Sequence, residues 1–439
     1  MVTDRFRWAF CQLDTLRRCM PSSIRKALNE LPTTLDETYE RALQEIPKEK
    51  REHAHRLFQC LVVAIRPLRV EELAELFAIE FDRDAGSSLK EGWRPESPED
   101  AVLSACSTLI AVIEIRGSKI VQFSHFSVKE YLTSDRLRTS KMDDYHIPLD
   151  AAHTILARAC LTVLLQLDEY VDKKRLETFP LAFYSARYWV DHAKYEDVAS
   201  RIQGAMEELF NPSEPYLAAC TWIHDVDSYK VRETIDDLEE RPERPNATAL
   251  YYAAVCGFSG LANYLIMTHG ENVHAKCGIR GSPLHAALYK RSLDVVRLLL
   301  AHGVDINTKS DGDESPLHLA SLDGDVDVTR LLLQHNADLN ARDDIEDTPL
   351  HNTSIRGTTT VAQLLLEHGA DVNSRGWSQC TPLYRASVNG HLDVVQLLLG
   401  HEADVHLRGE DDRTPFQAAT RHGYVEVAQL LLEHGAEKE

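Results

Sequence analysis

The sequence lacks the motifs of two enzyme classes. Its 439 residues contain no Gly-Lys pair and no Gly-x-Ser-x-Gly string. A P-loop nucleoside triphosphatase ends its glycine-rich loop in Gly-Lys-Ser/Thr, because the Lys and the hydroxyl contact phosphate and magnesium. A serine esterase of the α/β-hydrolase type carries its nucleophile on the Gly-x-Ser-x-Gly elbow. We therefore expect no catalytic residues and no bound cofactor, and predict that the chain is not an enzyme.

Positive charge and long apolar segments are also scarce. Lys and Arg number 48 against 69 Asp and Glu, which gives a net charge of −21. That charge repels phosphate backbones and anionic lipid, so nucleic acid and membranes are not expected partners, and neither are acidic partners. The apolar run from Cys60 to Ile65 is too short to span a bilayer. Nine scattered cysteines without a Cys-x-x-Cys motif fit reduced thiols, and we expect a cytoplasmic protein.

The C-terminal half instead contains a repeat. One phrase begins at Thr248, Ser282, Ser315, Thr348, Thr381 and Thr414, at a first interval of 34 residues and later intervals of 33. A second phrase, Leu-Leu-Leu, begins at Leu298, Leu331, Leu364, Leu397 and Leu430. Two unrelated phrases with one period indicate a structural repeat.

Each recurring residue type has a physical reason to recur. Ser or Thr before Pro caps a helix and provides its first turn. Glycines such as Gly324 and Gly357 can end that helix in the left-handed conformation. The period and these residues resemble ankyrin repeats. We predict six repeats over residues 241–439, an α-solenoid with short β-hairpins. The periodic histidines, His285, His302 and their equivalents such as His318 and His351, are expected to bond to backbone.

Positions that vary between repeats are candidates for contact with a partner, since framework positions repeat and the surface is free to differ. The resemblance implies that the first helix of each repeat lines a concave surface that binds a protein ligand. The candidates on these helices are Tyr289, Lys290, Leu319, Leu322, Asp323, Asn352, Ile355, Arg356, Arg385, Val388, Asn389 and Arg421. Trp377 stands in a polar hairpin tip, where it either offers apolar area to a partner or packs against the hairpin of the adjacent repeat.

Residues 51–140 have the pattern of a winged helix. Helices are expected from Ala54 to Ile65, from Val70 to Ile79 and from Ser97, with a polar linker over 82–96 and a hairpin over 110–123. Many winged helices bind DNA, but the helix in the recognition position carries Glu99 and Asp100 and no basic residue. We expect a packing module rather than a DNA reader.

Three phrases extend the resemblance to nearly the whole chain. Phe6 to Asp14, Leu31 to Arg41 and Phe123 to Leu132 resemble fungal NACHT-ankyrin proteins, which are NLR-like receptors. The resemblance implies that residues 1–50 are the last helices of a NACHT domain and that 141–240 form a helical spacer. Winged helices of this kind are labelled after a GPI inositol-deacylase. Since the P-loop is absent, residues 1–50 are expected to belong to a truncated NACHT region.

No metal site is expected. Asp323, Asp325 and Asp327 have the alternate spacing of a calcium loop, but Val328 and Gln334 stand where the loop needs Gly and Glu.

The sequence therefore favours a non-enzymatic interaction or scaffold protein, an NLR-like receptor remnant whose repeats bind a protein ligand. One alternative is part of a NACHT signalling receptor whose catalytic domain lies upstream or on another chain. Another is an ankyrin substrate adaptor of a ubiquitin ligase. Residues 1–140 are further expected to contact the rest of the chain or a second copy.

Overall fold

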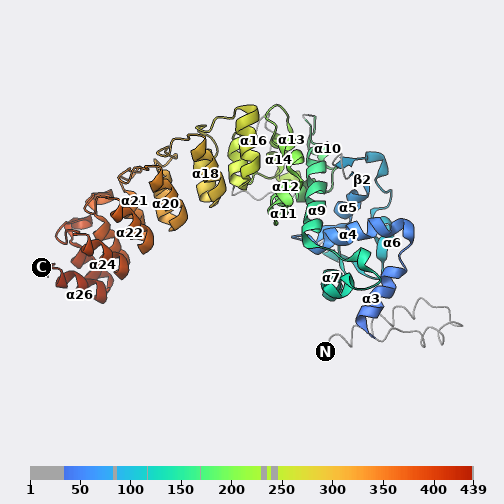
Figure 1. The fold of residues 1–439 in the computed structure, drawn as a ribbon, viewed down its shortest axis with the longest axis horizontal. Coiled ribbons are helices and arrows are strands. Elements are labelled where there is room, and N and C mark those ends of the chain that lie inside the picture. Colours follow the sequence, from blue (N-terminus) through green and yellow to red (C-terminus); the bar gives the residue numbers. More distant parts are fainter. Residues whose placement is uncertain are drawn as a thin grey trace. The chain divides into compact units, whose positions relative to one another are not determined.

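The structure is a computed structural model that describes residues 34–82, 87–115, 117–168, 170–228, 235–238 and 246–437 (Figure 1). The phrase Phe6 to Asp14 and the start of the phrase at Leu31 lie outside the described residues. The chain divides into two compact units. The N-terminal unit comprises Met1–Asp225 with Lys230–Arg244, and the repeat unit comprises Val226–Tyr229 with Pro245–Glu439.

The first half of the N-terminal unit has short helices around a small sheet. Its α-helices are α3 (Leu35–Gln44), α4 (Arg51–Val63), α5 (Val70–Ala74), α6 (Pro98–Cys106), α7 (Phe126–Leu132) and α8 (Asp135–Arg138). Its strands are β1 (Leu68–Arg69), β2 (Ile79–Phe81), β3 (Ser87–Leu89), β4 (Ile110–Ile115) and β5 (Ser118–Phe123). Three antiparallel strands form a sheet in the order β1-β5-β4.

The predicted wing is confirmed as the hairpin β4–β5, in which Val112 pairs with Val121. Two local predictions were wrong. The helix expected to reach Ile79 ends earlier, and a 3₁₀ turn over Glu75–Ala78 leads into β2. The stretch expected to be a linker contains β3, which pairs with β2. Ile79 is buried while Glu80 is exposed, so alternating burial places this segment in a strand.

The second half of the N-terminal unit is helical. It contains α9 (Leu149–Leu164), α10 (Lys173–Leu176), α11 (Ala182–Ala193), α12 (Val198–Arg201), α13 (Gln203–Leu209) and α14 (Tyr216–Ile223). Helix α9 is apolar around most of its circumference and packs against both α4 and α11. The winged-helix segment and the following helices therefore share one core.

The repeat unit contains six pairs of antiparallel helices (Figure 1). The first helices are α15 (Ala249–Cys256), α17 (Pro283–Tyr289), α19 (Pro316–Asp323), α21 (Pro349–Arg356), α23 (Pro382–Asn389) and α25 (Pro415–His422). The second helices are α16 (Ser259–His269), α18 (Leu293–Ala301), α20 (Val326–Gln334), α22 (Thr359–Glu367), α24 (Leu392–Gly400) and α26 (Val425–Glu433). This arrangement confirms the predicted mainly helical solenoid.

Histidines at one of the two predicted positions, that of His285, join neighbouring repeats through backbone, whereas Nε2 of His302 lies 3.3 Å from the side-chain oxygen Oδ1 of Asn263. The imidazole Nε2 of His318 lies 3.0 Å from the carbonyl oxygen of Asp347, and His285 and His351 make the equivalent contacts with Glu314 and Cys380. Burial lowers the pKa of all three imidazoles. A neutral ring can accept at Nδ1 from the capping Ser or Thr and donate at Nε2 to the next finger.

The loops between repeats, here called fingers, end in tight turns. The fourth finger is closed by the N–H of Gly376, which donates to the carbonyl oxygen of Cys380 at 2.9 Å. Asp313, Glu346, Gln379 and Asp412 occupy left-handed positions in successive tips, with φ between 54° and 67°. These are positions where Gly is free of strain. Hence these four non-glycine residues adopt the left-handed backbone conformation that glycine usually provides.

Candidate protein-binding surface

The variable positions of the first helices differ in how much they expose. Exposed side chains are those of Tyr289, Lys290, Asp323, Arg356, Asn389 and Arg421. Half-buried ones are Leu319, Leu322, Ile355, Arg385 and Val388. Asn352 is only 7% exposed, and its amide donates to the carbonyl oxygen of His318. The prediction that Asn352 contacts a partner is therefore corrected, because its side chain bonds helix α21 to α19.

A groove of about 320 Å³ lies between the second and third repeats. Tyr289, Leu319, Leu322 and Asp323 line it together. The guanidinium of Arg280 lies 3.5 Å from the centroid of the Tyr289 ring, so a cation already covers one ring face. The groove thus brings together candidates from two consecutive helices, α17 and α19.

Acidic groups surround the apolar floor of this groove. Glu314 and Asp311 line it beside Asp323. Burial raises the pKa of Glu314, and the nearby carboxylates of Asp343 and Asp344 raise it further. A cationic side chain of a ligand would relieve that repulsion.

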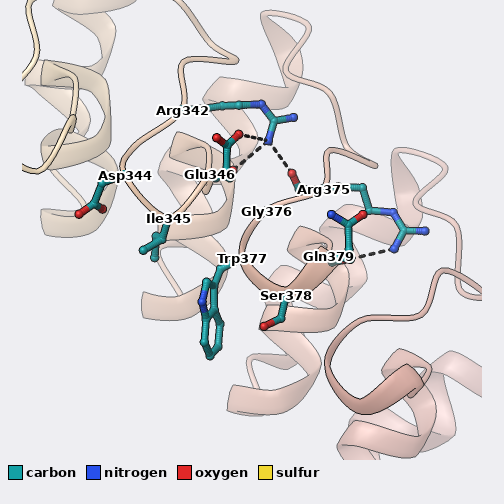
Figure 2. Close-up of a pocket in the computed structure, with 9 residues that line it drawn as sticks. All are labelled: Arg342, Asp344, Ile345, Glu346, Arg375, Gly376, Trp377, Ser378 and Gln379. Atoms are coloured by element: carbon teal, nitrogen blue, oxygen red, sulfur yellow. Dashed lines mark hydrogen bonds and ion pairs between the residues drawn. The ribbon is translucent and has the colours of Figure 1, made fainter.

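A second groove lies between the third and fourth fingers (Figure 2). Trp377 and Ile345 line it and are 46% and 44% exposed. The 3₁₀ turn Trp377–Gln379 positions the indole, and the N–H of Trp377 donates to Oδ1 of Asp347 at 2.8 Å. Trp377 is therefore held by its backbone while much of its ring is accessible.

Asp347 organises this second groove, although sequence analysis missed it. Its side chain is fully buried, and Oδ2 lies 3.5 Å from Nη2 of Arg385. The Arg385 guanidinium lies 5.1 Å from the centroid of the Trp377 ring. Sequence comparison of the repeats could have found Asp347, because the residue before each Ser/Thr-Pro phrase differs between repeats. These residues are Gly281, Glu314, Asp347, Cys380 and Arg413.

A row of basic side chains along the fingers was also missed. Nη1 of Arg342 donates to the carbonyl oxygen of Arg375 at 2.6 Å, and Nη1 of Arg375 donates to that of Arg408 at 2.6 Å. Lys309 makes the equivalent contact with Arg342. Figure 2 shows the Arg342 and Arg375 side chains along the groove. The 33-residue spacing of these basic residues was the available signal.

Val388 packs against a cluster of Cys380, Tyr384 and Ala418. Asp325 caps α20 by accepting a hydrogen bond from the N–H of Val328, which explains one of the three acids with the spacing of a calcium loop.

The described residues contain no group of three or more His, Cys, Asp or Glu side chains arranged to hold a metal ion. No helix in the described part of the chain is long and apolar enough to cross a membrane.

Comparison with protein families agrees with the two folds. The family model for ankyrin repeats matches three overlapping segments, 250–343, 317–409 and 378–439. The family model "GPI inositol-deacylase, winged helix domain" matches residues 39–144. The chain therefore contains ankyrin repeats and a winged helix of the GPI inositol-deacylase type.

One curated relative is the "Azaphilone pigments biosynthesis cluster protein L" of Monascus ruber, a fungal protein. It is 29% identical over 286 residues, which cover 62% of this chain. The chain spans 60% of the length of that relative.

Proposed function

We propose that this chain is a non-enzymatic scaffold whose ankyrin array binds a protein ligand along the first helices and fingers. The observation that carries the proposal is the pair of neighbouring grooves, each with an exposed aromatic ring, Tyr289 or Trp377. Large rings that are partly accessible and held in place by neighbouring groups are typical anchors of protein interfaces. Ankyrin repeats in general bind protein partners, which supports the same conclusion.

In a finer form, the proposal is that the chain belongs functionally with NLR-like receptors and acts in the cytoplasm. The phrase from Phe123 to Leu132 supports it, because it combines the end of the wing with α7 in the manner of those receptors. The alternative, a part of a NACHT signalling receptor, predicts that an upstream or separate NACHT domain binds this chain. Measuring ATP hydrolysis by the purified chain tests whether the chain itself is an enzyme. Turnover of ATP would contradict the scaffold proposal.

The binding proposal is tested by affinity capture and mass spectrometry from the organism that encodes the chain. Wild type, Tyr289→Ala and Trp377→Ala are immobilised in parallel. Met267→Ala is the matched control, because Met267 is an exposed apolar side chain, 69% accessible, on the second helix α16. We expect the same specific protein with wild type and Met267→Ala, and its loss from one or both aromatic variants. Equal capture by all four proteins would place the ligand elsewhere.

A further inference from the structure

The outer face of the wing is unusually apolar. Antiparallel strands alternate their side chains between two faces, and Ile113 pairs with Ile120. Val121 is buried on the face that packs on the core, so Ile113, Ile115 and Ile120 lie on the opposite face. Ile115 is 49% exposed. The solvent face of an antiparallel sheet is usually polar, so isoleucines there indicate a binding surface.

This face forms one wall of a groove of about 440 Å³ within the N-terminal unit. The opposite wall is helix α11, which contributes Phe183 and Arg187. Arg69 belongs to the sheet wall, because β1 pairs Arg69 with Ile120 on the outer face. The groove thus combines an apolar floor with guanidinium groups on two sides.

The charge of the groove is opposite to that of the chain. Arg66 is held by Glu72 through two hydrogen bonds of 2.8 and 2.6 Å. Arg69 and Arg187 have no carboxylate partner among the residues that the structure describes. None of the side chains that line the groove is acidic, although the whole chain has a net charge of −21. Two arginines therefore remain available for a ligand carboxylate.

The position of Arg187 favours such contact. Its guanidinium lies 5.3 Å from the centroid of the Tyr188 ring. A guanidinium that lies over an aromatic ring can still offer its N–H groups to the two oxygens of a carboxylate. Arg187 can therefore donate to a ligand without leaving the ring.

We propose that this groove binds an acidic peptide segment of a partner protein, with an aliphatic residue on Ile115 and Ile120 and flanking carboxylates on Arg69 and Arg187. The guanidinium groups favour a ligand with carboxylates, and the apolar floor favours a peptide over nucleic acid or a lipid headgroup. A nucleic acid or a lipid headgroup would leave the isoleucines uncovered, whereas a peptide with an aliphatic side chain covers them. This surface is separate from the ankyrin grooves and does not depend on their ligand.

The test is fluorescence anisotropy with the full chain and a capped, labelled peptide, Asp-Glu-Ile-Asp-Glu. We expect saturable binding that weakens at least about tenfold in Arg187→Glu and in Ile115→Asn, since each removes one half of the recognition. Lys174→Glu is the matched control. It makes the same charge change at an exposed side chain of α10 outside the groove, and its affinity should stay near that of wild type. Circular dichroism melting verifies that each variant is folded.

Further probes separate the components of recognition. The peptide Asn-Gln-Ile-Asn-Gln removes the charges, and Asp-Glu-Ser-Asp-Glu removes the aliphatic side chain, so both should bind more weakly than the parent. Equal affinities for Arg187→Glu and Lys174→Glu would overturn the proposal. So would the absence of saturable binding up to about 1 mM peptide. Sedimentation of the chain with phosphatidylserine vesicles but no peptide binding would assign the groove to lipid and also overturn it.

Discussion

Each of the two units of this molecule is stabilised by its own internal contacts, and these contacts differ in how far apart in sequence the joined residues are. In the N-terminal unit, hydrogen bonds join Tyr39 to Ser127, the N–H of Ile65 to Tyr184 and the N–H of Leu181 to Glu75, across 88, 119 and 106 residues. In the repeat unit, the histidine contacts span 29 residues and the arginine contacts span 33. We therefore expect the first unit to unfold as a whole and the second to lose structure repeat by repeat.

The largest expected effect comes from Glu75→Ala in the N-terminal unit. The Glu75 side chain is 1% exposed, and it binds both Nη2 of Arg94 and the N–H of Leu181 at 2.7 Å. Removing it leaves a cation and a backbone donor without a partner, which should cost about 3 to 5 kcal/mol. Urea denaturation followed by circular dichroism measures the loss.

The control for Glu75→Ala is Glu80→Ala, whose carboxylate is about half exposed and pairs with Lys90 at 3.3 Å. An exposed pair of this kind contributes about 0 to 1 kcal/mol. If both variants lost the same stability, the buried carboxylate would not connect distant segments of the unit.

In the repeat unit, Leu365→Ala is expected to cost about 2 to 5 kcal/mol through lost burial and the cavity left behind. Leu365 is fully buried in α22. Hydrogen exchange should show lost protection in the repeats on either side and little change in the N-terminal unit. Val425→Ala, at a side chain that is 74% exposed, should change little. A uniform loss of protection over both units would refute the repeat-by-repeat behaviour.

The difference in contact range also explains what could be predicted from sequence. The repeats were predictable because each framework residue recurs, and His318, Gly324 and the Leu-Leu-Leu phrase occupy the roles that local chemistry assigns them. The buried Glu75 was not identified as a connecting residue, because its partner Leu181 is 106 residues away and follows no period.

The candidate surface shows the same limit. Tyr289 and Leu322 were found because they vary at one repeated position, and the structure places both in one groove. Asn352 varies too, but its amide turned inward to bond with His318, which spacing alone does not reveal. Asp347 was missed because its contacts with Trp377 and Arg385 cross between repeats.

Acidification should weaken the repeat unit through its buried histidines. Burial lowers the pKa of His318 in the folded state, so the unfolded state binds the proton more readily. Its stabilising contribution is complete above the unfolded pKa of about 6.5, and it falls by up to about 1.4 kcal/mol per pH unit until the folded pKa is reached. The variant His318→Gln should therefore show a weaker pH dependence in urea denaturation between those two values, by about one proton.

His335→Gln is the control for that experiment, because His335 is exposed at the end of α20. We expect it to keep the pH dependence of wild type. A His318→Gln variant with the full wild-type dependence would show that other groups account for the acid sensitivity.

The smallest expected effect concerns the basic row along the fingers. Arg375→Ala removes one hydrogen bond within its own finger, to Gln379, and one to Arg408 of the next. Because the row lies at the surface, the cost should be about 0.5 to 1.5 kcal/mol in urea denaturation. Arg330→Ala, at an exposed arginine on α20, should cost less. An equal effect of the two substitutions would mean that the fingers are joined by the histidine contacts and helix packing alone. A larger cost for Arg375→Ala, with exchange protection lost in the fourth and fifth fingers, would show that the finger row connects adjacent repeats independently of the helices.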